Sequence, residues 1–480
     1  MKQTFSLFSK DVRHLRPEIG AYVGLLMAYS IAAPQTRLGH LSMGFSGIFV
    51  TLVKLLMLVS CFVLIARAVQ EDKLVGEEQF WITRPYRWTS LLAAKLLFTA
   101  VCVFLPFVLM QWVVLLGAGL NPFAEKTGMV LSLLRVVLNV LLPFLVAASV
   151  TENLAAALTF IMVLLVSWAG SLTLLLSGKD MRMSPPYELE LFGALFGGLL
   201  LGTLIYQYAR RRTLHSRAAI LLTLALFLLM IVGYDRAGFG PPIQALIRSH
   251  YPVRDSPRLV FAGSAPYEDN EEDMVVPRDQ VEIKLPIHIE GLPSGAKFLN
   301  TNILITLDAA GTHYSSPWER VAVSEDFIAF QMPKSVWDRF AGTPARLHLE
   351  LVAEELRLAR VESITVADRF AGPLHGSCEL ILGGVYCRYP YQEMTPTRVQ
   401  AEVKPLRATC GDSSKAVAMA ASLRHVPPGW TPDPVIDEQL PIRGTFCLGD
   451  QLQFSEFASA GNIRLILDLP SLNIAEYGVR

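Results

Sequence analysis

The stretch LLAAKLLFTAVCVFLPFVLMQWVVLL, residues 91–116, decides the fold class because it carries a single charged side chain, Lys95. A helix needs about 20 mostly apolar residues to cross the hydrocarbon core of a bilayer. The stretch exceeds that length, so it predicts a transmembrane helix.

Similar apolar runs fill the first half of the chain. The protein has 480 residues, of which 52% are hydrophobic and 18% charged, whereas soluble domains carry about 25% charged residues. From about residue 235 onward the sequence reads like a soluble protein. We therefore predict an α-helical membrane domain over 19–234. Its seven expected spans are 19–36, 45–66, 91–116, 129–150, 154–176, 189–208 and 218–234.

Lysine and arginine predict the orientation of these spans. With the N-terminus in the cytoplasm, the inner segments carry thirteen Lys and Arg residues, counting Lys95 with the inner loop that precedes it, and the outer loops carry four. Cytoplasmic loops of membrane proteins have this excess of positive charge. An odd number of spans then places the C-terminal half outside the cytoplasm. Over the whole chain Lys+Arg and Asp+Glu both number 42, so no excess charge would attract nucleic acid.

The first 18 residues predict an amphipathic helix in the membrane interface. Phe5, Phe8, Val12 and Leu15 are spaced so that they share one helical face, while basic residues fill the other. The alternative is a basic leader without fixed structure.

Lys54 is a charge inside the second apolar run. A charged side chain there costs several kcal/mol, of the order of 3, unless it is paired or reaches the interface. It is either a lysine of a transport pathway or, as we favour, one near the outer interface or packed against a carbonyl.

The loop over 67–90 reads RAVQEDKLVGEEQFWITRPYRWTS and combines acidic residues, bulky aromatics and arginines. Exposed aromatic and arginine side chains are typical of protein-binding surfaces. The alternative is that Phe80 and Trp81 lie at the membrane interface as part of an aromatic belt.

The segment EQFWITRP (78–85), followed by LLAAKLLF (91–98), resembles the permease subunits of type-2 ABC exporters, specifically a bacterial group with an FW-x-TRP motif. The resemblance covers roughly residues 1–210. It implies an interfacial elbow helix, six spans, the bacterial plasma membrane, and a dimer of identical or different permease subunits. It also implies that the loop docks on a separate ABC ATPase subunit. The docking candidates that it implies are Glu78, Phe80, Trp81, Thr83, Arg84 and Pro85.

The seventh span and the large C-terminal region depart from this family pattern. The chain has no phosphate-binding loop of its own, because Gly178-Lys179 is followed by Asp180 instead of serine or threonine. We identify no catalytic constellation, metal site or cofactor site, so the protein is not expected to be an enzyme.

The C-terminal half predicts a mainly antiparallel, sandwich-like β domain in two parts, 235–370 and 371–480. Val281, Ile283, Leu285, Ile287 and Ile289 alternate with other residues at the strand period of two. This half also contains four cysteines, for which an oxidising compartment predicts two disulfides. A glycine-rich hairpin turn between Cys378 and Cys387 favours their pairing, which leaves Cys410 with Cys447.

Two functions follow from these patterns. The first is a permease subunit of an ATP-driven ABC transporter, an exporter like the family that it resembles. The second is a non-transporting membrane anchor or sensor whose β domain binds a ligand or partner. The neighbouring gene would discriminate them, since only the first requires a P-loop ATPase.

Overall fold

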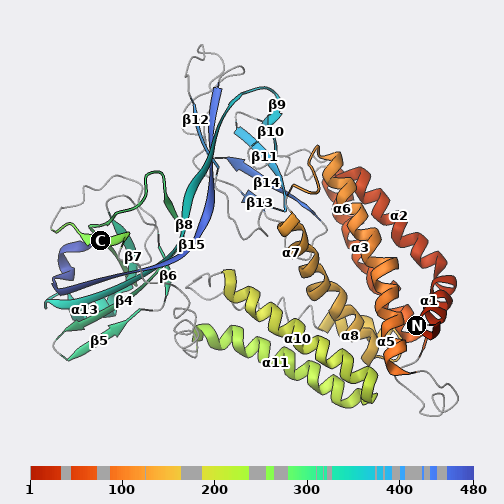
Figure 1. Cartoon of the computed structure of the whole chain (residues 1–480). Coiled ribbons are helices and arrows are strands. Elements are labelled where there is room, and N and C mark those ends of the chain that lie inside the picture. The colour runs from red at the N-terminus through yellow and green to blue at the C-terminus, as the bar shows by residue number, and fades with distance from the viewer. Residues whose placement is uncertain are drawn as a thin grey trace. The chain divides into compact units, whose positions relative to one another are not determined.

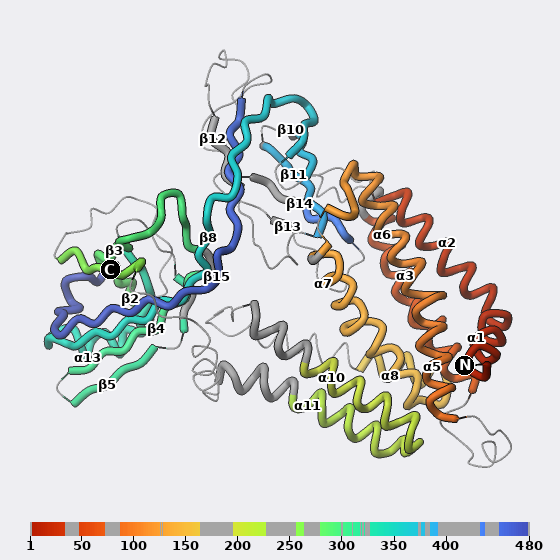
Figure 2. Tube along the Cα trace, viewed as in Figure 1, coloured from red at the N-terminus to blue at the C-terminus, as the bar shows by residue number. Residues whose placement is uncertain are grey.

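The computed structural model forms two compact units, which are described separately. The first comprises Met1–Ser177, Pro186–Ile231 and Arg360–Glu456, and the second comprises Gly178–Pro185, Val232–Ala359 and Phe457–Arg480. The following description covers the residues that Figure 1 draws in colour, and Figure 2 traces the chain from the same side. These are 2–33, 45–72, 87–124, 126–163, 186–236, 256–263, 279–309, 311–316, 318–321, 327–372, 376–381, 384–391, 401–405, 424–425, 433–440 and 451–479.

Helices make up the larger part of the first unit. In chain order they are α1 (Lys2–His14), α2 (Arg16–Ala32), α3 (Phe45–Gln70), α5 (Trp88–Phe98), η2 (Thr99–Phe104), α6 (Leu105–Gly117), α7 (Lys126–Val136), η3 (Val137–Leu141), α8 (Leu142–Val150), α10 (Pro186–Arg210) and α11 (Thr213–Arg236). Figure 1 shows α2 beside α3 and α6, which it contacts.

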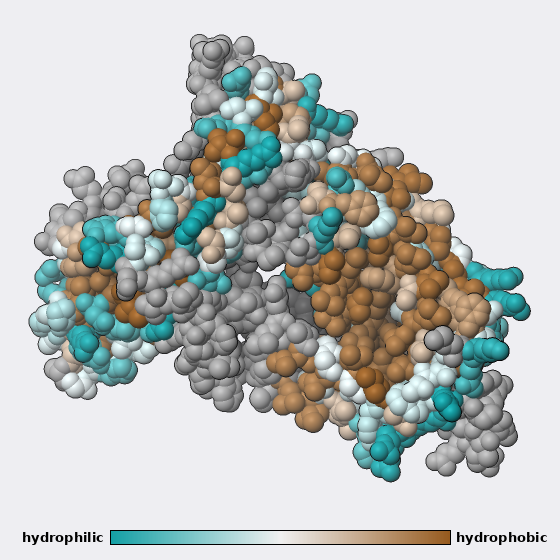
Figure 3. All heavy atoms as spheres, in the orientation of Figure 1, coloured by the Kyte–Doolittle hydropathy of each residue, from teal (hydrophilic) through white to brown (hydrophobic). Residues whose placement is uncertain are grey.

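Three helices in the described part of the chain are long and apolar enough to cross a membrane. They are Ile48–Gln70, Trp88–Gly117 and Gly128–Val150. Helices also form in the predicted runs 19–36, 189–208 and 218–234, but the count of about seven spans stays a prediction. Figure 3 shows hydrophobic side chains gathered on the surface of the helical part. Leu52, Leu109 and Leu116 of these helices are exposed, and the hydrocarbon of a bilayer would solvate such side chains.

Two proline residues account for the π-helical turns in the long helices. Pro106 follows η2, and Pro143 follows η3. Proline lacks a backbone N–H and clashes with the preceding turn, so the regular i to i−4 ladder cannot continue through it. A local π turn absorbs the misfit, and such turns are frequent at functional sites.

The first unit also contains a small antiparallel sheet with the strand order β13-β14-β11-β10-β9. Its strands are β9 (Arg369–Ala371), β10 (Ser377–Ile381), β11 (Gly384–Pro390), β13 (Arg424–His425) and β14 (Val435–Leu440). In its β10–β11 hairpin Cys378 lies opposite Cys387, with the two Sγ atoms at disulfide-bonding distance. This agrees with the pairing predicted from the hairpin, whereas Cys410 and Cys447 lie outside the described residues.

The second unit is mainly antiparallel β. Its strands are β1 (Arg258–Phe261), β2 (Gln280–Leu285), β3 (Ile287–Glu290), β4 (Lys297–Ala309), β5 (Thr312–Ser315), β6 (Glu319–Arg320), β7 (Ile328–Pro333), β16 (Gly478–Val479), and parts of β8 (Ala345–Thr365) and β15 (Gln451–Leu472). Strands β15-β8-β4-β5 form one sheet and β16-β2-β7 another. Both sheets contribute to one buried core, as does the short helix α13 (Lys334–Phe340).

The two compact units are not consecutive along the chain, and the predicted domain boundaries stay a prediction. The last part of the chain, Phe457–Arg480, belongs to the second unit together with Val232–Ala359. Strand β15 is long enough to contribute to both units, and its first residues pair with β12 (Ala401–Pro405). The two β parts are therefore nested in sequence, and a search for consecutive segments cannot find that arrangement.

Candidate functional site: a buried ionic cluster at the base of the loop

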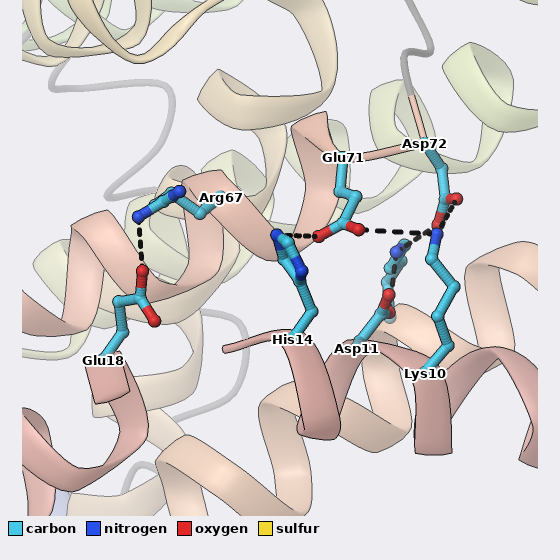
Figure 4. A network of polar contacts seen from close by, with 8 residues as sticks. Lys10, Asp11, His14, Glu18, Arg67, Glu71 and Asp72 are labelled. Atoms are coloured by element: carbon cyan, nitrogen blue, oxygen red, sulfur yellow. Dashed lines mark hydrogen bonds and ion pairs between the residues drawn. The ribbon is translucent and has the colours of Figure 1, made fainter. Parts of the chain in front are cut away.

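Four charged side chains meet where α1, the end of α3 and the last turn of α5 come together. The Lys95 ammonium on α5 lies 2.7 Å from a carboxylate oxygen of Asp11 on α1, and it also pairs with Asp72, just beyond α3. Lys10 on α1 donates a hydrogen bond of 3.1 Å to the other oxygen of Asp72. Lys95, Asp11 and Asp72 are 1%, 0% and 4% exposed. We call Lys10, Asp11, Asp72 and Lys95 the ionic cluster; Figure 4 labels its members Lys10, Asp11 and Asp72.

The local sequence explains why two of these charges are buried. Asp11 follows Leu7 and precedes Leu15 by four residues each, so it lies on the buried side of α1 with Leu7, in line with Leu15 just beyond the helix. Lys95 lies in the apolar run LLAAKLLF, beside the buried residues Leu91 and Ala94. Because a buried charge is costly unless it is paired, each supplies the counter-charge that the other needs.

Burial and charge pairing act against each other at the two carboxyl groups. Burial raises the pKa of the Asp11 carboxyl, and attraction to Lys95 offsets only part of that rise. Burial also raises the pKa of Asp72, but here the nearby Lys95 and Lys10 ammonium groups prevail and its pKa lies below the usual value. Asp72 is thus the firmly ionised partner, held between two cations.

Further polar contacts surround the ionic cluster. Glu71 lies 3.6 Å from both Lys10 and His14, and Arg67 on α3 pairs with Glu18 on α2. These contacts tie α1 and α2 to the last turn of α3.

A second set of polar contacts joins α3 and the following helices. Gln70 on α3 donates to the Thr151 hydroxyl at 3.1 Å. Gln207 on α10 donates to the Ser149 carbonyl, and Ser216 on α11 donates to Gln207 at 2.7 Å. The helix ends on the Asp72 side are therefore linked by hydrogen bonds as well as by apolar packing.

The structure places the predicted interfacial residues only in part on one buried face. Leu15 is buried just after α1 ends, Phe8 and Val12 pack partly buried against the core, and Phe5 is 65% exposed. Sequence reasoning missed Leu7 and Asp11, which face the bundle. The sequence signal that could have found them is a lone acidic residue, Asp11, with a leucine four positions before it and another four positions after it.

The predicted docking residues Glu78, Phe80, Trp81, Thr83, Arg84 and Pro85 lie outside the described residues. The ionic cluster nevertheless contains residues on both sides of their segment in the sequence. Asp72 is the last described residue before it, and Lys95 lies on the helix that begins directly after it. The helix that follows the loop is thus paired, through Lys95, with Asp72 before the loop and with Asp11 on α1.

Lys54 on α3 has a partner far away in the sequence. Its ammonium pairs with the carboxylate of Asp433, just before β14, and the Tyr29 hydroxyl of α2 donates to the same carboxylate. Nearby, the Tyr391 hydroxyl donates to the Gln111 side chain of α6 at 3.0 Å. The small sheet of the first unit is therefore attached to the helices by polar contacts.

These arrangements join helices and the small sheet through ion pairs and hydrogen bonds. Within the described part of the chain, no three His, Cys, Asp or Glu side chains are grouped so that they could hold a metal ion. No family model matches the sequence, and neither a curated protein nor a solved structure does. What the chain does must therefore be inferred from its own residues.

Proposed function

We propose that this protein is the membrane-spanning permease subunit of an ATP-driven ABC transporter, working as an exporter with a separate ATPase. In this proposal about seven spans cross the bacterial plasma membrane as a dimer of permease subunits. The N-terminus lies in the cytoplasm, and the C-terminal β region lies outside. The resemblance of 78–85 to the FW-x-TRP motif motivates the proposal.

The observation that carries the proposal is the ionic cluster at the base of the loop. A permease without its own phosphate-binding loop must receive force through a contact with another protein. A loop passes such force on only if its ends are held firmly. Lys95 ties α5, the helix after the loop, to Asp72 before the loop, and Asp11 ties Lys95 to α1. A push on the loop would therefore reach α1, α3 and α5 together.

The contact residues can be tested directly. We expect Trp81→Ala and Arg84→Glu each to weaken ATPase binding by more than about tenfold, since aromatic and arginine anchors contribute about 2 kcal/mol or more at an interface centre. The measurement is co-purification of the ATPase, followed by its affinity for the purified chain in nanodiscs.

The matched control is Trp88→Ala, which removes an equally large aromatic side chain from the start of α5. It should leave ATPase binding unchanged. Membrane insertion should be normal in all three variants. If Trp81→Ala and Arg84→Glu insert normally and bind the ATPase as the unmodified chain does, or if no ATPase co-purifies at all, the loop is not the coupling site.

A second candidate is a membrane sensor without transport activity. The contacts of Asp433 and Tyr391 favour it, because they connect the small sheet to α2, α3 and α6. A ligand that moved the sheet would act on these helices. In a sensor, changes in 78–85 should leave function intact, which separates it from the first candidate.

A further inference from the structure

A cavity of about 350 Å³ lies among the helices of the first unit. Side chains of α2, α3, η2, α6, α7 and η3 line it, including Tyr22, Lys54, Cys61, Val103, Val140 and Leu141. Its volume is at the low end of the roughly 300–1,000 Å³ of small-molecule sites. The lining is almost entirely apolar, so the occupant must present mostly hydrocarbon.

The backbone around the cavity is irregular in two places. Val103 and Phe104 belong to the π turn before Pro106, and Val140 and Leu141 belong to the one before Pro143. Two different helices thus turn their irregular segments toward the same space. Since π turns concentrate at functional sites, this coincidence favours a binding cavity over an ordinary packing defect.

Lys54 is the one Lys, Arg, Asp or Glu side chain among the described residues that line the cavity. Its side chain is 25% exposed, and a carboxylate, that of Asp433, already accepts from it and from Tyr29. The Lys54 ammonium in the cavity wall and the Tyr29 hydroxyl on α2 therefore already bind one oxyanion, the carboxylate of Asp433. A ligand with an anionic headgroup has the charge that Lys54 and Tyr29 complement.

We infer that this cavity binds a single-chain amphiphile, with its alkyl chain among the apolar residues and its anionic headgroup at Lys54. Asp433 occupies the headgroup position when no ligand is bound, so ligand binding competes with the Lys54–Asp433 ion pair. The inference goes beyond the proposed function, because neither the ATPase nor the loop over 67–90 is needed for binding.

The test is photo-crosslinking of the full chain in phosphatidylcholine nanodiscs. The probe is a diazirine-bearing hexadecyl sulfate, which stays anionic, and its neutral and cationic counterparts are the matching hexadecanol and hexadecylamine. We expect sulfate adducts to map to α3, η2 and η3. Lys54→Met should reduce sulfate labelling about tenfold, the worth of a charge-assisted hydrogen bond, and leave hexadecanol labelling unchanged.

Cavity filling provides the second arm. Val140→Trp should abolish labelling by hexadecyl sulfate and hexadecanol, whereas Leu109→Trp, at an exposed position of α6, should not. Excess unlabelled hexadecyl sulfate should displace the probe from the unmodified chain, a measurement that needs no variant. Adducts spread evenly over exposed positions, no displacement, or labelling indifferent to Lys54→Met and headgroup charge would overturn the inference.

A membrane lipid and a transported molecule share this chemistry. If the ATPase and ATP reduce sulfate labelling, the bound molecule is cargo, and if labelling persists, it is a structural lipid; both outcomes support the site. Failure of the site would leave the docking experiment on Trp81 and Arg84 unaffected, so the two proposals fail separately.

Discussion

Lys95 and Lys54 are both lysines within apolar helices, yet their surroundings differ in kind. Lys95 is 1% exposed and has two carboxylate partners, Asp11 and Asp72, which are themselves buried. Lys54 is 25% exposed and pairs with Asp433, which is 24% exposed. The first belongs to a sealed cluster between helices, and the second lies at a cavity and at the attachment of a sheet.

This difference in burial determines what each lysine can do. A buried ion pair gives little net stability, but removal of one partner leaves an uncompensated charge and is costly. Such a cluster is suited to hold elements in a fixed arrangement. A partly exposed pair can exchange its partner for water or a ligand at lower cost. Lys95 therefore holds its helices in a fixed arrangement, whereas Lys54 can exchange its carboxylate partner for water or a ligand.

The largest expected effect is that of Lys95→Met. The change leaves Asp11 and Asp72 buried beside a thioether, with Lys10 as their remaining cation. We expect a loss of about 3–5 kcal/mol in the free energy of unfolding, the usual consequence of breaking a buried pair. Thermal unfolding of the detergent-solubilised chain, followed by size-exclusion chromatography, measures it.

The double variant Lys95→Met with Asp11→Asn sharpens this result. It removes one cation and one anion together, which leaves Asp72 with Lys10. It should therefore recover a substantial part of the lost stability. If the double variant is as unstable as the single one, the damage comes from altered packing of α5 and not from an unpaired charge.

A smaller effect is expected for Lys54→Met. Asp433 loses its cation but keeps the Tyr29 hydroxyl and its access to solvent, so the loss should be about 1–2 kcal/mol, below the usual range for a buried pair. The same unfolding assay compares it with Lys95→Met. The double variant Lys54→Asp with Asp433→Lys, which exchanges the two charges, should have most of the stability of the unmodified chain. A loss as large as that at Lys95 would contradict the exchangeable role.

The smallest effect concerns a third paired cation, His348 in the second unit. Its Nδ1 lies 2.8 Å from Asp468 and its Nε2 lies 3.3 Å from Glu350, so both ring nitrogens face carboxylates. Burial lowers the pKa of His348, but the two carboxylates outweigh it, and the pKa lies above its usual value. The stabilisation is full below the unfolded pKa, about 6.5, and is lost as pH rises through the higher folded pKa.

We therefore expect the β region of the unmodified chain to lose up to about 1 kcal/mol of stability between pH 6 and pH 8, since the pair is partly exposed. His348→Gln should remove that pH dependence. Thermal unfolding followed by the circular dichroism of β structure, at both pH values, measures the difference. A variant with the same pH dependence as the unmodified chain would assign it to another group.

Several features could be predicted from the sequence because they depend on neighbours along the chain. The apolar run 91–116 is helical, since its composition fixes the element whatever surrounds it. The alternation through Val281, Ile283 and Leu285 gives strand β2, with all three side chains buried. The hairpin that brings Cys378 opposite Cys387 is equally local.

Other features were decided only by the tertiary structure. Lys95 counted as a loop charge in the sequence but became the centre of a buried cluster, since its partners Asp11 and Asp72 come from two other helices. Lys54 was expected near an interface or a carbonyl, and the sequence did not indicate its partner Asp433, 379 residues away. Periodicity determines which face of a helix is apolar, because it depends on residues a few positions apart. Which opposite charges meet depends on how distant segments pack, and no local pattern records that.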